Sequence, residues 1–116
     1  MEYIDEHSTT IELPKAEITK WNDLLSKDSI DFNEHGFKDL ETVFKRSAKF
    51  ENGCEVDFKV NTTSSDRNGR GQVYAEMVLF DEDGHEMVCS EPCYEMDGTC
   101  YLYYGSETYR VNMIVI

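Results

Sequence analysis

Hydrophobic residues recur at two different spacings, and the change of spacing divides the chain into two parts. In the first part, apolar residues return every three or four positions after Pro14, a residue that fits the first turn of a helix. These apolar residues are Ile18, Trp21, Leu24 and Leu25. The spacing predicts an amphipathic helix of about three turns over residues 14–26, with a strand before it at residues 9–13. We interpret residues 28–41 as a loop with a short helical turn near residues 38–41.

From residue 42 onward the spacing becomes two, which is the period of a strand with one apolar face. Val56, Phe58 and Val60, for example, alternate with charged or polar neighbours. The dipeptide Asn52-Gly53 is a strong hairpin signal, and turn residues also stand at 81–84, 97–98 and 105–106. This pattern predicts about six strands in three successive hairpins.

Together these patterns predict an α+β fold: an N-terminal amphipathic helix packed on a curved antiparallel sheet of about six strands. The chain of 116 residues has the length of one domain, with the helix in residues 1–41 and the hairpins in residues 42–116. If the last strand, residues 107–116, lies at a sheet edge, it can pair across a dimer axis.

The charge balance narrows the choice of partner. The 24 acidic residues outnumber the 11 lysines and arginines, which gives a net charge of −13. Such a surface repels nucleic acids and anionic membranes and attracts basic proteins, although it also serves solubility alone. The residues after Met1 form no secretory signal and no long apolar stretch follows, so we expect a cytoplasmic protein whose cysteines are free thiols.

One group of residues has the chemistry of a zinc site, namely His85, Cys89, Cys93 and Cys100. Its spacing argues against shared coordination, because residues 85 and 89 of one strand lie about 13 Å apart. Asp81, Glu82 and Asp83 form an acidic turn that can also hold a cation, but turn formation explains these residues without a metal. We expect no metal and no cofactor.

Catalysis has little support in the sequence. There is no nucleophile elbow around a serine and no phosphate-binding glycine loop ahead of a helix. The basic loop at residues 67–71 is more simply a connector than a phosphate site. We therefore expect a protein that binds a partner and is not an enzyme.

Tyrosines are concentrated in the last hairpin. In a strand, Tyr101 and Tyr103 share one face, whereas Leu102 lies on the opposite face. One face must meet the core, so the other exposes tyrosines beside acidic residues, as protein-binding surfaces do. Cross-strand aromatic pairing that merely stabilises an outer face explains the same pattern.

The hairpin region also resembles a known group of proteins. The segments at residues 48–57, 78–84 and 109–111 resemble small acidic proteins carried by phages and mobile elements of gut Firmicutes, a group that includes anti-CRISPR inhibitors. The resemblance covers about residues 42–116. It implies an inhibitor that occupies the basic nucleic-acid channel of a CRISPR effector such as Cas9, with carboxylates in place of phosphates.

Under this hypothesis the partner-binding residues are Glu55, Asp57, Asp81, Glu82 and Asp83, together with Tyr101 and Tyr103. The alternatives are an accessory interaction protein of a mobile element without nucleic-acid mimicry, or a small metal-binding protein. Charge placement separates the first two hypotheses, because mimicry requires the acids on one continuous surface.

Overall fold

The computed structural model describes residues 5–90 and 98–116, so the expectations that concern Cys93 and the turn at residue 97 lie outside the described part. Its elements, in chain order, are β1 (Asp5–Leu13), α1 (Lys15–Leu25), β2 (Ile30–Asp31), α2 (Phe32–His35), β3 (Thr42–Lys49), β4 (Glu55–Thr62), β5 (Arg70–Gly71), β6 (Val73–Phe80), β7 (Glu86–Cys89), β8 (Gly98–Tyr104) and β9 (Glu107–Val115).

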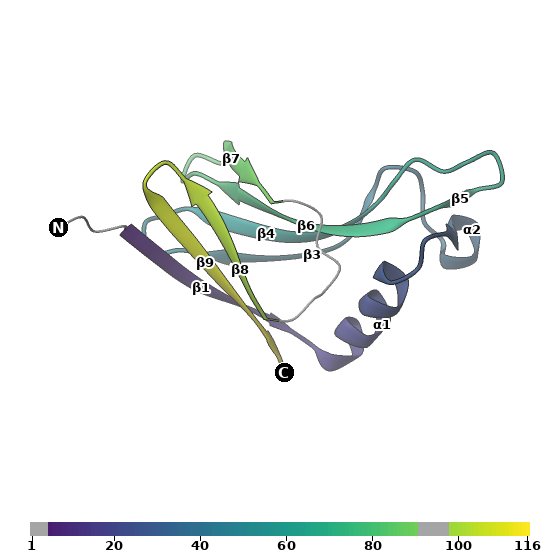
Figure 1. The fold of residues 1–116 in the computed structure, drawn as a ribbon, viewed down its shortest axis with the longest axis horizontal. Coiled ribbons are helices and arrows are strands. Elements are labelled where there is room, and N and C mark those ends of the chain that lie inside the picture. Colours follow the sequence, from purple (N-terminus) through teal and green to yellow (C-terminus); the bar gives the residue numbers. More distant parts are fainter. Residues whose placement is uncertain (1–4, 91–97) are drawn as a thin grey trace.

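The strands form two main sheets that face each other (Figure 1). A four-stranded antiparallel sheet has the order β3-β4-β6-β7, and a three-stranded sheet has the order β1-β9-β8. In the second sheet β9 pairs with β8 antiparallel and with β1 parallel. The short strands β2 and β5 form a separate antiparallel pair near α2.

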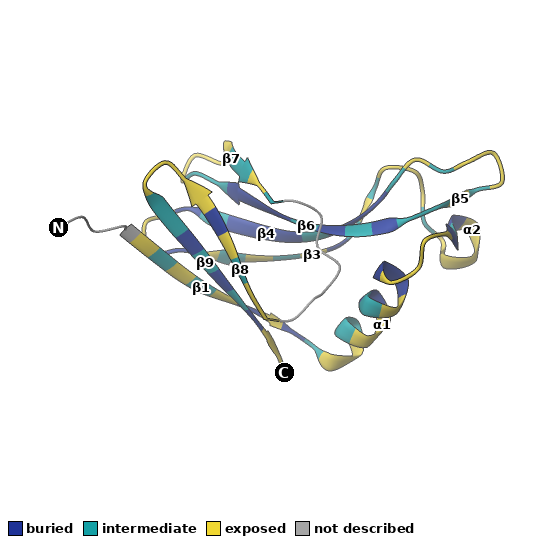
Figure 2. Cartoon of the chain, in the orientation of Figure 1, coloured by how far each residue is buried: buried dark blue, intermediate teal, exposed yellow. Residues whose placement is uncertain are grey.

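The core lies between the two sheets, with α1 packed beside one end of it (Figure 2). Phe58 of β4, Met77 of β6 and Tyr109 of β9 are fully buried. Alternate residues of β4, β6 and β9 point inward, as a half-buried strand requires. Trp21 of α1 is also buried, and its ring lies tilted against Phe44 of β3 with the centroids 5.5 Å apart, so the helix packs its apolar stripe on the four-stranded sheet.

Helix α1 lies within the predicted range. Pro14 stands immediately before it, and Leu24 and Leu25 are buried with Trp21. The Trp21 indole donates a hydrogen bond to the Glu17 carboxylate, one turn earlier, at 3.0 Å. The amphipathic spacing therefore produced the expected helix, and its polar face stabilises the orientation of the buried tryptophan.

Other parts of the predicted architecture are wrong. The sheet is not a single curved sheet of six strands, because the last hairpin leaves the others and pairs with the chain's first strand. The helix is not N-terminal: the strand predicted before it at residues 9–13 is present as the longer β1, which has nine residues and belongs to the three-stranded sheet. The second helical turn lies at Phe32–His35 and not at residues 38–41. The last strand, β9, is central in its sheet and therefore offers no free edge.

Loss of the ring of Phe58 tests the packing of the two sheets. We predict that Phe58→Ala lowers the free energy of unfolding by about 3–5 kcal/mol, because the side chain is fully buried and its removal leaves a cavity. Chemical denaturation measures the loss. Tyr103→Ala, at a site 65% exposed, serves as the control and is expected to change stability by less than about 1 kcal/mol. Equal losses in both variants would contradict the described core.

Candidate functional site

Four segments that are distant in sequence meet at one end of the molecule's 56 Å long axis (Figure 1). They are residues 6–8, 49–55, 80–86 and 104–107, and we call them together the acidic turn end. Its eight acidic residues are Glu6, Glu51, Glu55, Asp81, Glu82, Asp83, Glu86 and Glu107. Lys49 is the one lysine or arginine within these four segments.

The charge is unevenly distributed between this end and the rest of the molecule. Outside the acidic turn end, the described residues include twelve acidic and ten basic side chains. Most of the described excess of negative charge is therefore at one end. A concentration of negative charge at one end favours attraction to a basic surface.

The β3–β4 and β6–β7 turns lie against each other and enclose a hollow of about 280 Å³. Glu55, Asp81 and Glu82 line it, with Phe80 as an aromatic wall. Gly53 makes the close approach possible: its φ is +95°, and a Cβ atom there would stand 3.2 Å from Glu82 Cβ. The structure thus brings three of the predicted binding residues together.

The β6–β7 turn is shaped by the side chain of Asp81. Its carboxylate accepts hydrogen bonds from the backbone N–H groups of His85, at 2.8 Å, and Asp83, at 2.9 Å. The bond from His85 is the main reason that the pKa of Asp81 lies below its usual value. Because the folded-state pKa is lowered, this contribution to the turn is present at neutral pH and is lost as the pH falls through that pKa.

Asp81, Asp83 and His85 also have ligand atoms within 4.8 Å of one another. All three belong to a surface turn, and hydrogen bonds within the turn already account for their proximity. The predicted zinc ligands His85 and Cys89 do not contact a common group. The His85 ring pairs with Asp81, whereas the Cys89 thiol donates a hydrogen bond to Glu76. Within the described ranges, these two predicted ligands therefore have different partners.

Asp57 does not belong to the exposed surface. It is 6% exposed, accepts a hydrogen bond from Ser47 at 2.7 Å, and has the Lys45 ammonium 3.9 Å from its carboxylate. Glu55, two residues earlier, lies directly opposite Lys49 in the sheet. We therefore leave Asp57 out of the binding surface and retain Glu55 at its border.

The two predicted tyrosines lie on the other sheet. Tyr101 and Tyr103 are 47% and 65% exposed, their ring centroids are 6.5 Å apart, and Leu102 between them is buried. The predicted assignment of faces is therefore confirmed. However, they lie on the outer face of the three-stranded sheet, whereas Glu55 lies on the outer face of the opposite sheet. The two tyrosines therefore do not line the hollow beside Glu55, Asp81 and Glu82, although Tyr103 directly precedes residues 104–107 of the acidic turn end.

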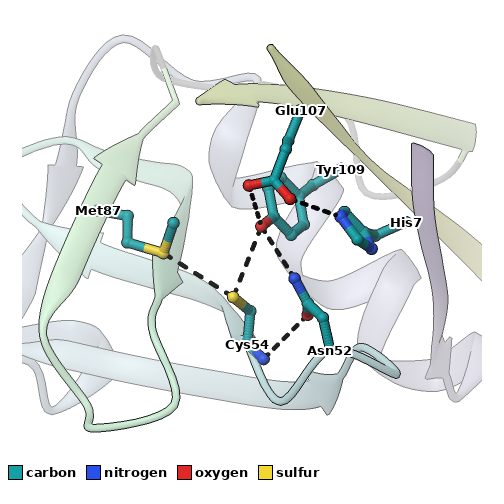
Figure 3. A network of polar contacts seen from close by, with 6 residues as sticks. All are labelled: His7, Asn52, Cys54, Met87, Glu107 and Tyr109. Carbon is teal, nitrogen blue, oxygen red and sulfur yellow. Dashed lines mark hydrogen bonds and ion pairs between the residues drawn. The ribbon is translucent and has the colours of Figure 1, made fainter. Parts of the chain in front are cut away.

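A polar network connects the two sheets beneath the acidic turn end (Figure 3). Asn52 donates to the Tyr109 hydroxyl at 3.0 Å, and Glu107 contacts both that hydroxyl and the His7 ring, at 3.3 and 3.1 Å. Cys54 lies 3.6 Å from the same hydroxyl. Desolvation, followed by the Cys54 contact, raises the pKa of Tyr109, so the phenol stays protonated and able to donate at neutral pH.

Sequence reasoning missed this network. Asn52 was identified only as a turn residue, and Glu107 lies far from it in sequence. The one available signal was a tyrosine at an inward position of an otherwise aliphatic strand, since a buried hydroxyl needs a hydrogen-bond partner. The network fixes the β3–β4 turn to β9 and so positions Glu51 and Glu55 relative to Glu107.

Comparison with known proteins identifies no relative. No protein family, curated protein or solved structure matches the chain. Neither described helix has the length and apolar character needed to cross a membrane.

Removal of the Asn52 side chain tests the connection between the sheets. We predict that Asn52→Ala lowers the free energy of unfolding by about 1–3 kcal/mol, because the buried Tyr109 hydroxyl loses the donor that Asn52 supplies and the Cys54 amide loses its side-chain acceptor. Asn68→Ala, in an exposed turn, is the control for loss of a turn asparagine. A loss no larger in Asn52→Ala than in the control would show that the network contributes nothing measurable.

The reactivity of Cys89 tests the electrostatics of the outer face of the four-stranded sheet. Desolvation, together with the hydrogen bond to Glu76, raises the pKa of this thiol to about 11. We predict slow alkylation of Cys89 at pH 8, a rate that rises with pH toward that value, and faster alkylation in Glu76→Gln. Site-resolved mass spectrometry measures the rates. A rate at pH 8 as high as that of an unfolded peptide would contradict the raised pKa.

Proposed function

We propose that this chain is a non-enzymatic binding protein whose acidic turn end occupies the basic nucleic-acid-binding surface of a partner, as an inhibitor of anti-CRISPR type acts on Cas9. The observation that carries the proposal is the uneven charge: at one end eight acidic residues face only Lys49 and the Arg110 guanidinium, which lies 3.6 Å from Glu6, and the described rest of the chain has a smaller excess of negative charge. An acidity that served only solubility would not require this placement.

The charge density at this end suits occupation of such a channel. A DNA duplex as long as the molecule's 29 Å second dimension carries roughly 17 phosphate charges, at one charge per ~1.7 Å. The eight carboxylates are about half of that number. This is enough for electrostatic steering and for pairing with a group of lysines and arginines, without the full regularity of a nucleic acid.

The turn end is also held in a defined shape. Gly53 lets the two neighbouring turns touch, Asp81 fixes the β6–β7 turn, and Tyr109 connects the β3–β4 turn to the other sheet. A preorganised surface loses less conformational entropy on binding than flexible acidic side chains on a mobile loop. The proposal involves no metal, cofactor or direct contact with nucleic acid, and it places the protein in the cytoplasm of a host bacterium.

A second function is favoured by a separate observation. The exposed, stacked pair Tyr101 and Tyr103 is the kind of aromatic surface that protein interfaces use. It supports an accessory interaction protein of a mobile element that binds its partner without mimicry. Double substitution of these tyrosines by serine would then abolish partner binding, whereas charge substitutions at the turns would have little effect.

The charge hypothesis is tested by two triple variants with the same net charge. The first, Glu51→Gln/Glu82→Gln/Asp83→Asn, removes three exposed acids from the turn end. The control, Asp23→Asn/Asp28→Asn/Glu34→Gln, removes three exposed acids from the helical end. Binding of each purified protein to Cas9, with and without guide RNA, is measured over a salt series.

We expect wild-type binding that weakens steeply with salt and competes with guide or target loading. The turn-end variant should bind about 10- to 100-fold more weakly at 0.1 M salt, and the control within about threefold of wild type. Equal weakening of binding in both variants would show that binding depends only on the net charge of the protein and not on the position of the acids. No binding of the wild-type chain to several Cas9 types at low salt would reject this target.

A further inference from the structure

Leu40 has an unusual backbone and an unusual exposure. Its φ is +51°, and it is the one non-glycine residue with positive φ among the described residues. Its side chain is 70% exposed, the highest value among the large hydrophobic side chains in the described ranges. Both properties are unfavourable for a leucine, because the left-handed region crowds its Cβ atom and water surrounds its apolar group.

The hydrogen bonds around Leu40 hold this conformation in place. The Lys38 amide donates to the Glu41 carboxylate at 2.6 Å, and the Glu41 amide donates to the Thr62 hydroxyl at 2.9 Å. The Thr62 hydroxyl in turn donates to the Lys38 carbonyl, while the Leu40 amide donates to the Thr63 carbonyl at 3.3 Å. The turn is therefore fixed by its neighbours and does not depend on the leucine side chain.

Glycine or asparagine would satisfy this position better than leucine. Either residue adopts a positive φ at lower cost, and neither exposes an apolar side chain. The fold holds this site rigidly, yet leucine is unfavourable there for both its backbone conformation and its solvation. This combination indicates that the side chain serves contact with another molecule and not the stability of the fold.

Leu40 borders a shallow hollow of about 160 Å³ on the outer face of the four-stranded sheet. Lys59, Asn61, Tyr74 and Glu76 line the same hollow, and Lys59 lies opposite Glu76 in the sheet. Asn61 and Glu55 both lie on this face of β4, six residues apart, which is roughly 20 Å at 3.3 Å per residue. One interface of ordinary size, about 800 Å² on each partner, reaches both Leu40 and the acidic turn end.

We infer that Leu40 is the apolar anchor of the same interface, inserting into an apolar pocket beside the basic surface of the partner protein. The inference rests on the proposed function and adds a second contact of different chemistry. The carboxylates attract and orient the partner, and the leucine contributes contact energy at short range. Binding energy in protein interfaces is commonly concentrated in a few rigidly held anchors of this kind.

The test uses Leu40→Gly, Leu40→Asn and Leu40→Met, with Ile114→Thr as the control for an exposed apolar residue on the other sheet. Binding to Cas9 is measured over the salt series, and melting temperature and oligomeric state are measured for each free protein. We expect Leu40→Gly and Leu40→Asn to bind about tenfold more weakly with an unchanged salt slope, because no charge is altered. Their melting temperatures should equal or exceed the wild-type value, and Leu40→Met and Ile114→Thr should bind nearly as wild type.

Three results would overturn the inference and leave the proposed function standing. The first is wild-type affinity in Leu40→Gly and Leu40→Asn while the turn-end variant is weakened. The second is a loss of binding that only parallels a lower melting temperature, which would make Leu40 a structural residue. The third is a wild-type dimer that Leu40→Gly converts to a monomer, which would show that Leu40 contacts a second copy of this chain and not the partner protein. If the wild-type chain does not bind at all, the proposed function and the inference both fail.

Discussion

The parallel pairing of β1 with β9 is the constraint on which the rest of the structure depends. It joins the beginning of the chain to its end over nine residues and makes β9 the central strand of the second sheet. With strands on both sides, β9 buries Tyr109 and its aliphatic neighbours against the first sheet. The same pairing places Glu6 and His7 beside Glu107 and so completes the acidic turn end.

The distribution of charge follows from this architecture. Inward-facing strand positions are occupied by the core, and each acid on the outer face of β4 has a lysine of β3 near it: Glu55 lies opposite Lys49, and the Asp57 carboxylate lies 3.9 Å from the Lys45 ammonium. The turns have neither restriction, so they can carry many like charges without burying one. Mutual repulsion among these carboxylates opposes the close approach of the turns. The hydrogen bonds of the network around Tyr109 offset this repulsion, and Gly53 leaves the space that Glu82 needs.

Features governed by local sequence could be predicted, and features governed by distant pairing could not. The helix after Pro14, the Asn52-Gly53 turn and the opposite faces of Tyr101 and Leu102 depend on a few consecutive residues. The division into two sheets depends on contact between strands about a hundred residues apart, which no local period reveals. The burial of Asp57 was missed for a different reason: the hairpin was predicted, but not the side-chain contacts with Ser47 and Lys45 across it.

The most direct test of the acidic turn end as the binding surface is hydrogen–deuterium exchange of the chain, free and bound to Cas9. We predict slower exchange in the complex at the backbone amides of residues 50–54 and 81–85, with little change in residues 15–35. Protection confined to the helical end, or to the outer face of β8 around Tyr101 and Tyr103, would show that the partner binds elsewhere and would contradict the role assigned to the acidic turns.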